Sequence, residues 1–112
     1  MKKIVAIIRA SKFESVREAL GSIGVRFFTY YEVRGFGLQK GEHMVYRGAV
    51  YDMGYIARYK LEILIESSKV ELTVSTIIKN AKTGEIGDGK IYVEALESVY
   101  RIRTGDEGST AV

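Results

Sequence analysis

Two glycine-rich stretches of the chain have the residues needed to hold a phosphate group. The first, residues 84–90, reads Gly-Glu-Ile-Gly-Asp-Gly-Lys and ends in Lys90. Its glycines allow the main chain to come close to an anion, its N–H groups can form an anion-binding nest, and the lysine adds a point charge. The second, residues 35–41, has glycines at positions 35, 37 and 41. The simpler alternatives are a tight turn with a solvated lysine for the first stretch and a flexible loop root for the second.

Gly84-x-x-x-x-Gly89-Lys90 nearly spells the P-loop of nucleoside triphosphatases, but two features argue against that identity. Ile91 stands where the motif places the Ser or Thr that holds magnesium. The expected order of elements is also helix, loop, strand, whereas a P-loop runs strand, loop, helix. No serine, histidine and acid stand at a recognisable catalytic spacing, and no nucleophile has a neighbouring base. The sequence therefore favours binding without chemistry.

Three further groups are candidates for contact with a ligand or partner. Arg101 and Arg103 would share one face of an extended segment, where two guanidinium groups suit a phosphate or carboxylate. A solvated edge is the alternative. The sole histidine, His43, and the absence of cysteine argue against a metal site built from those residue types. Tyr51 lies in a glycine-rich stretch, open to a modifying enzyme or to a contact with a partner.

Length and composition predict one domain, residues 1–112, of ordinary size. No apolar run approaches the roughly 20 residues that cross a bilayer, and Arg9 interrupts the apolar start of the chain too early for a signal peptide. We therefore expect a cytoplasmic protein. The net charge of +3 is modest and its basic residues are interleaved with acids, which argues against direct nucleic-acid binding.

Hydrophobic periodicity predicts four strands and two helices. The expected strands are residues 3–9, 27–36, 60–66 and 91–96, and the expected helices follow capping boxes at Ser11-x-x-Glu14 and Ser68-x-x-Glu71. A long loop, residues 37–55, separates the second and third strands; a second loop covers residues 82–90, and a C-terminal segment covers 97–112. The order β-α-β-loop-β-α-β is that of a ferredoxin-like α+β sandwich with both helices on one face of the sheet.

The apolar residues of each element indicate which side faces the core. The first helix has the stripe Phe13, Val16, Leu20 and Ile23, ending at Gly24; the second has Val70, Val74, Ile77, Ile78 and Ala81; the third strand has Leu61, Ile63 and Ile65. Tyr30, Leu64 and Tyr92 are unusual for a bare sheet face. We expect self-association to cover that face.

Taken together, these residues resemble the PII nitrogen-regulatory signal-transduction proteins over the whole chain. Tyr46-Arg47-Gly48-Ala49-Val50-Tyr51 is similar to the family's modification-site signature, and residues 83–91 are similar to its second signature. Gly35-Phe36-Gly37, Gln39-Lys40-Gly41 and the segment 101–105 fit the same pattern.

The resemblance implies a homotrimer with ATP or ADP in each cleft between neighbouring subunits. The implied nucleotide-binding residues are Ile7, Gly35, Phe36, Gly37, Leu38, Gln39, Gly87, Asp88, Gly89 and Lys90 on one side, with Thr29, Leu64, Arg101 and Arg103 from the neighbour. It also implies that 2-oxoglutarate joins the site through a magnesium ion on ATP held by Gln39, with Lys40, Gly41 and Arg58 as further effector contacts. The long loop would then engage targets such as ammonium channels or nitrogen-assimilation enzymes, the only membrane contact being through such a transporter, and Tyr51 would be the modified residue.

The chain departs from the family pattern at several of these positions. Leu38 stands where the family has an arginine that helps to hold the terminal phosphate, so we expect weaker discrimination of ATP from ADP. Arg58 stands where the family has a lysine that pairs with 2-oxoglutarate or with the acid at Glu62; arginine keeps the charge but changes its geometry. Val50 stands where the family usually has an acid beside Tyr51. Two alternatives stay open: an enzyme of the same fold acting on a phosphorylated small molecule, and a ligand-free assembly or metal-tolerance module of similar trimeric build.

Overall fold

The computed structural model describes residues 1–35, 44–46, 49–51 and 57–112, with the backbone alone for 44–46 and 49–51. The main strands are β1 (Lys2–Arg9), β2 (Thr29–Arg34), β5 (Ala57–Ile65) and β6 (Gly89–Ala95), and the helices are α1 (Phe13–Ser22) and α2 (Val70–Ala81). Short 3-10 turns are η1 (Ala10–Lys12), η2 (Ser67–Lys69) and η3 (Gly108–Ala111). Within the predicted long loop, β3 (Met44–Tyr46) pairs antiparallel with β4 (Ala49–Tyr51).

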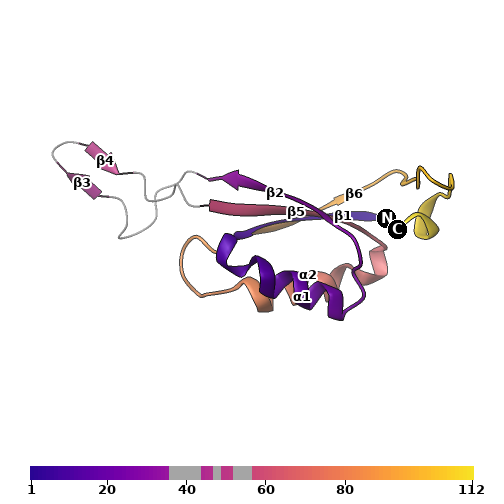
Figure 1. Ribbon diagram of the computed structural model, residues 1–112, viewed down its shortest axis with the longest axis horizontal. Helices are drawn as coiled ribbons and strands as arrows, with labels where there is room; N and C mark the ends of the chain where they lie inside the picture. The colour runs from indigo at the N-terminus through magenta and orange to yellow at the C-terminus, as the bar shows by residue number, and fades with distance from the viewer. Residues whose placement is uncertain (36–43, 47–48, 52–56) are drawn as a thin grey trace.

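The four main strands form one antiparallel sheet in the order β2-β5-β1-β6. Both helices cover the same face of this sheet (Figure 1). The predicted ferredoxin-like α+β arrangement is therefore confirmed. The apolar strand β1 occupies an interior position because its side chains are buried on both faces: Ile4, Ala6 and Ile8 towards the helices, and Val5 on the opposite face.

The core lies between the helices and the sheet. All three residues predicted for the third strand and three of the four predicted for α1 are buried, while Ile23 packs against the core from a partly buried position. The stripe of α2 is correct for Ile77 and Ala81 but wrong for Ile78, which is 50% exposed. Thr73 takes a buried place instead, because its hydroxyl donates to the Lys69 carbonyl and so needs no water.

The two helices begin differently from the prediction. Neither has a side-chain cap hydrogen bond; the turns η1 and η2 lead directly into Phe13 and Val70. The predicted capping boxes are therefore wrong, because Ser11 and Ser68 lie inside a 3-10 turn rather than in the extended conformation of a capping residue.

The end of α1 agrees with the prediction. Gly24 has φ of +88°, its N–H donates to the Gly21 carbonyl, and the Val25 N–H donates to the Leu20 carbonyl. This pair of bonds is a Schellman motif with glycine in the left-handed position. Within the described residues, neither helix is long and apolar enough to span a membrane.

The face of the sheet opposite the helices, called the open face below, carries alternate residues of every main strand. Leu64 and Tyr92 lie on it and are 42% and 43% exposed. Tyr30 does not: its ring lies 4.6 Å from that of Phe13, on the helix side. The prediction for Tyr30 was wrong because β2 places Thr29 and Tyr31, rather than Tyr30, on the open face.

Gly89, the first residue of β6, gives a direct test of this backbone arrangement. It has φ of +107°, and an added Cβ would lie 1.8 Å from the Ile7 carbonyl oxygen. We expect Gly89→Ala to lower the free energy of unfolding by about 2–4 kcal/mol, because backbone strain and a steric clash add together. Gly21→Ala, in α1 with no atom within 4 Å of the added Cβ, should instead raise it by roughly 0.5–1 kcal/mol. Urea denaturation of both variants measures the difference, and equal effects would contradict the clash.

Candidate functional site

The loop between α2 and β6, residues 82–88, is built around the carboxylate of Asp88. This carboxylate accepts hydrogen bonds from the backbone N–H groups of Thr83 and Gly84, each 2.9 Å away, and from the Thr83 hydroxyl. Gly84 and Gly87 have φ of +91° and +102°, so the turn uses backbone conformations that favour glycine. The Gly84 N–H, which belongs to the stretch predicted to bind an anion, therefore holds the chain's own carboxylate together with the Thr83 N–H.

Two arginines of the sheet bind the other side of this loop. Arg9, at the end of β1, donates from Nε to Asp88 Oδ1 at 3.0 Å and from Nη2 to the Ile86 carbonyl at 2.9 Å. Arg58, near the start of β5, donates from Nη1 to the Gly87 carbonyl. Arg58 is only 8% exposed, and its Nε would lie 3.3 Å from a Cβ added to Gly35. Arg58 thus joins Gly35, the last described residue before the long loop, to Gly87.

The electrostatics of this end of the sheet favour an anionic ligand. The Thr83 hydroxyl, followed by the backbone N–H groups of Thr83 and Gly84 and by Arg9, holds the pKa of Asp88 well below its usual range, so Asp88 stays ionised. The Asp88 carboxylate pairs with Arg9, and the loop adds Lys82 and Glu85. Arg58 binds the Gly87 carbonyl, while Lys60 and Lys90 flank Ile7 in the strand pairing. The described residues here therefore carry more positive than negative charge.

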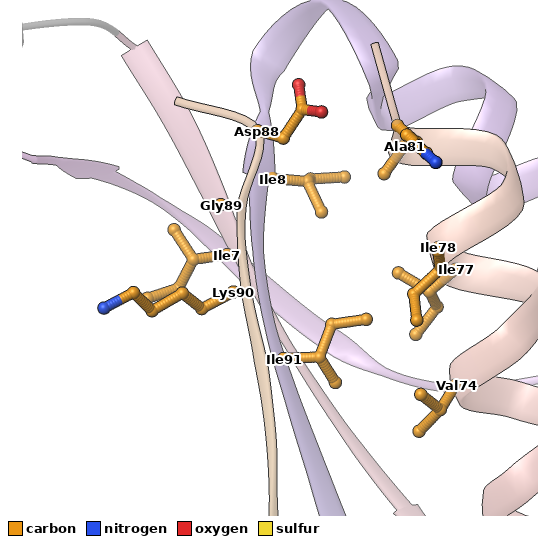
Figure 2. Close-up of a pocket in the computed structure, with 11 residues that line it drawn as sticks. Ile7, Ile8, Val74, Ile77, Ile78, Ala81, Asp88, Gly89, Lys90 and Ile91 are labelled. Atoms are coloured by element: carbon orange, nitrogen blue, oxygen red, sulfur yellow. The ribbon is translucent and has the colours of Figure 1, made fainter. Parts of the chain in front are cut away.

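Ile7 and Lys90 lie on the open face. Figure 2 shows both side chains pointing away from a hollow of about 340 Å³ between α2 and β6. Ile8, Ile91 and the apolar residues of α2 line that hollow, with Asp88 at its rim (Figure 2). Ile7 and Lys90 are nevertheless among the residues that line the hollow, while their side chains point from the sheet towards the open face (Figure 2).

One chain brings together only part of the predicted nucleotide site. Ile7, Gly35, Arg58 and residues 87–90 lie at one end of the sheet. Leu64 pairs with Lys3 of β1. Lys3 is four residues from Ile7 along the same strand, a distance of about 13 Å. Thr29 is on β2 at the far edge, three strand spacings or about 14 Å from β6. Within one chain these residues therefore lie apart, as separate groups rather than as one cluster.

Arg101 and Arg103 follow the far end of β6, and their conformation differs from the prediction. The Arg101 N–H donates to the Asp106 carbonyl, and the Gly105 N–H donates to the Arg101 carbonyl at 2.7 Å. Residues 102–104 thus form a turn, so an extended segment with both guanidinium groups on one face is wrong. The turn forms because Gly105, with φ of +75°, closes it in a conformation that other residues rarely adopt.

Several predicted residues lie outside the described residues. They are Phe36, Gly37, Leu38, Gln39, Lys40, Gly41 and His43, together with the side chain of Tyr51. Their roles in binding the nucleotide, the effector and magnesium, and in modification, stay predictions. Among the residues that the structure does describe, no group of three or more His, Cys, Asp or Glu side chains is placed to hold a metal ion.

Two residues that contact Asp88 were not singled out for the site from the sequence: Arg9 and Thr83. Thr83 stood within the second signature stretch, and Arg9 was visible only as the charged end of an apolar strand. Their role depends on contacts made across 79 and 5 residues of chain respectively, so no local pattern could reveal the first of them.

Comparison with known proteins gives a consistent result. The family model described as nitrogen regulatory protein P-II matches residues 1–106. The chain is 48% identical to nitrogen regulatory protein P-II 1 of Escherichia coli (strain K12), over the full length of both. It is 46% identical, again over the full length of both chains, to nitrogen regulatory protein P-II of Pasteurella multocida (strain Pm70).

Replacing the carboxylate at the centre of the loop tests its role through pH. A lowered pKa in the folded state means that Asp88 stabilises the fold above the unfolded-state pKa of about 3.9 and loses this effect as the pH falls further. We expect Asp88→Asn to lower the free energy of unfolding by about 1 kcal/mol at pH 6, after allowing for partial exposure. The difference in the free energy of unfolding between the wild type and Asp88→Asn should narrow below about pH 4. Urea denaturation from pH 6 to pH 2.5, with Asp106→Asn as the control, measures this; a gap independent of pH would contradict it.

Proposed function

The chain belongs to the nitrogen regulatory protein P-II family, and from this premise we propose that it is a trimeric sensor of adenine nucleotides. In this proposal ATP or ADP binds between neighbouring subunits, and residues 37–55 engage the regulated proteins. Family membership supports a regulatory role in nitrogen metabolism rather than a catalytic one.

The separation of the predicted site residues across one sheet is the observation that carries the proposal. The cationic end holds Gly35, residues 87–90 and Ile7, while Thr29 on the edge strand β2, Leu64, Arg101 and Arg103 lie apart from it in the same chain. A second copy that brings its far end against the cationic end would unite the two groups. The exposed apolar side chains of Leu64 and Tyr92 on the open face support an assembly that covers them.

The built geometry of the loop supports binding of a phosphate-bearing ligand. Asp88, Arg9 and Arg58 fix the loop before any ligand arrives, so little conformational entropy is lost on binding. Lys90 projects from the adjacent strand on the open face and adds a mobile positive charge (Figure 2). The adenine would then pack against apolar side chains such as Ile7 and the neighbour's Leu64.

The effector and the targets follow from the same proposal. Residues 39–41 and Arg58 would contact 2-oxoglutarate, with magnesium bridging it to ATP through Gln39. Ligand binding would shift the population of conformations of residues 37–55 towards one that binds the target better or worse. Ammonium channels and nitrogen-assimilation enzymes are the proposed targets, and the proposed location is the cytoplasm.

Calorimetry with ATP and ADP tests the nucleotide site. We expect Lys90→Ala and Arg103→Ala each to weaken binding by roughly 10- to 100-fold, because each removes a charge-assisted contact of about 1.5–3 kcal/mol. Lys79→Ala, an exposed lysine of α2, should leave the affinity unchanged. Unchanged affinity in both site variants would reject the assignment, and sustained phosphate release from ATP would favour the enzyme alternative.

Light scattering after size exclusion tests the assembly. We expect a mass three times that of one chain, and we expect Leu64→Glu to reduce it because a carboxylate would be buried in the interface. Leu72→Glu is the matched control, since Leu72 is 55% exposed on α2 and lies away from the open face. A monomeric wild-type protein would contradict the proposal, as would a Leu64→Glu variant that assembles like the control.

A further inference from the structure

Arg9, at the end of β1, binds two separate groups of the loop between α2 and β6. Its guanidinium donates to the carboxylate of Asp88 at 3.0 Å and to the carbonyl of Ile86 at 2.9 Å, across 79 and 77 residues of chain. The Arg9 side chain is 18% exposed; its bond to Asp88 is partly buried, whereas its bond to the Ile86 carbonyl is exposed. One side chain therefore fixes two points of the loop, separated by a single residue.

The orientation of the peptide groups in this loop follows from its two arginines. Arg9 binds the Ile86 carbonyl and Arg58 binds the Gly87 carbonyl. In a planar trans peptide the C=O and the N–H of the same unit point in opposite directions. The N–H groups of Gly87 and Asp88 belong to these two units, so they point away from the guanidinium groups. Within the described part of the chain, neither N–H has a hydrogen-bond acceptor.

The pairing of Arg9 with Arg58 makes the loop and the sheet depend on each other. The two residues are direct partners between β1 and β5. Like charges directly opposite each other destabilise a sheet unless other groups compensate them. Here the loop supplies two carbonyls and one carboxylate as acceptors, and in return its backbone is held against the sheet.

We propose that Arg9 is a positioning residue for the nucleotide site: it turns the Gly87 N–H outward and so prepares the loop to receive a phosphate oxygen. The inference rests on the function proposed above. It depends on the forked shape of arginine, because lysine keeps the charge but offers a single ammonium group that cannot span the same two acceptors in a fixed geometry.

The experiment compares Arg9→Lys and Arg9→Met with Arg26→Met, which removes an exposed arginine outside the site. Calorimetry measures the affinity for ATP with magnesium, and amide hydrogen exchange of the ligand-free protein measures opening of residues 83–89. We expect about a tenfold loss of affinity in Arg9→Lys and a larger loss in Arg9→Met, because lysine keeps the charge without the fork, whereas methionine removes both. Exchange should be faster at residues 83–89 in both variants and unchanged between β1 and β5.

The outcomes separate positioning from a purely electrostatic role. If Arg9→Lys binds ATP as tightly as the wild type, charge alone suffices and the inference is overturned. The inference is also overturned if the ATP affinity of Arg9→Met stays within twofold of the ATP affinity of Arg26→Met. If Arg9→Met does not fold, Arg9→Lys and Arg9→Gln provide the same comparison. If the wild type binds neither ATP nor ADP, the proposed function fails, while unchanged exchange at residues 83–89 would separately reject the positioning role.

Discussion

The passage of Gly89 over the carbonyl of Ile7 is the constraint on which the arrangement of the site depends. A side chain at this position would collide with the backbone of β1, so only glycine lets β6 begin where it does. This close approach sets the register of β6 on β1 and places Lys90 beside Ile7 on the open face. It also brings the preceding loop within reach of Arg9 and Arg58. A tight main-chain contact thus positions Lys90 and the Asp88 loop against the arginines of β1 and β5.

The charge of the Asp88 carboxylate is balanced mainly by neighbouring groups of the same chain. Asp88 is surrounded by two backbone N–H groups, a hydroxyl and a guanidinium, which explains its lowered pKa. The two arginines are bound by acceptors of the loop: Arg9 by the Asp88 carboxylate and the Ile86 carbonyl, and Arg58 by the Gly87 carbonyl. What is left over is positive charge on the open face, where Lys60 and Lys90 flank Ile7. An anion bound there would meet two lysine side chains beside a loop whose backbone is already fixed by Asp88, Arg9 and Arg58.

The open face connects this local site to the proposed assembly. Leu64 and Tyr92 are partly exposed on it, while Tyr31 donates a hydrogen bond to Glu62, which also pairs with Lys3. The face is thus neither a hydrophobic core nor an ordinary solvated surface. A homotrimer that covers it would unite the two separated groups of predicted site residues, which is why binding and assembly are proposed together.

The sequence by itself determined the order of the four main strands and two helices, most of the core residues of α1, α2 and β5, and the glycine-rich stretches with Lys90, because these depend on short-range periodicity and on the conformational freedom of glycine. It could not determine that Ser11 and Ser68 lie in 3-10 turns, that Tyr30 faces the helices, or that Arg101 begins a turn, since packing selects among locally similar conformations. Only the tertiary structure decided that Asp88 fills part of its own loop and that Arg9 and Arg58 hold two consecutive carbonyls. Those contacts join residues far apart in the chain, and their geometry exists only once β1, β5 and β6 have paired.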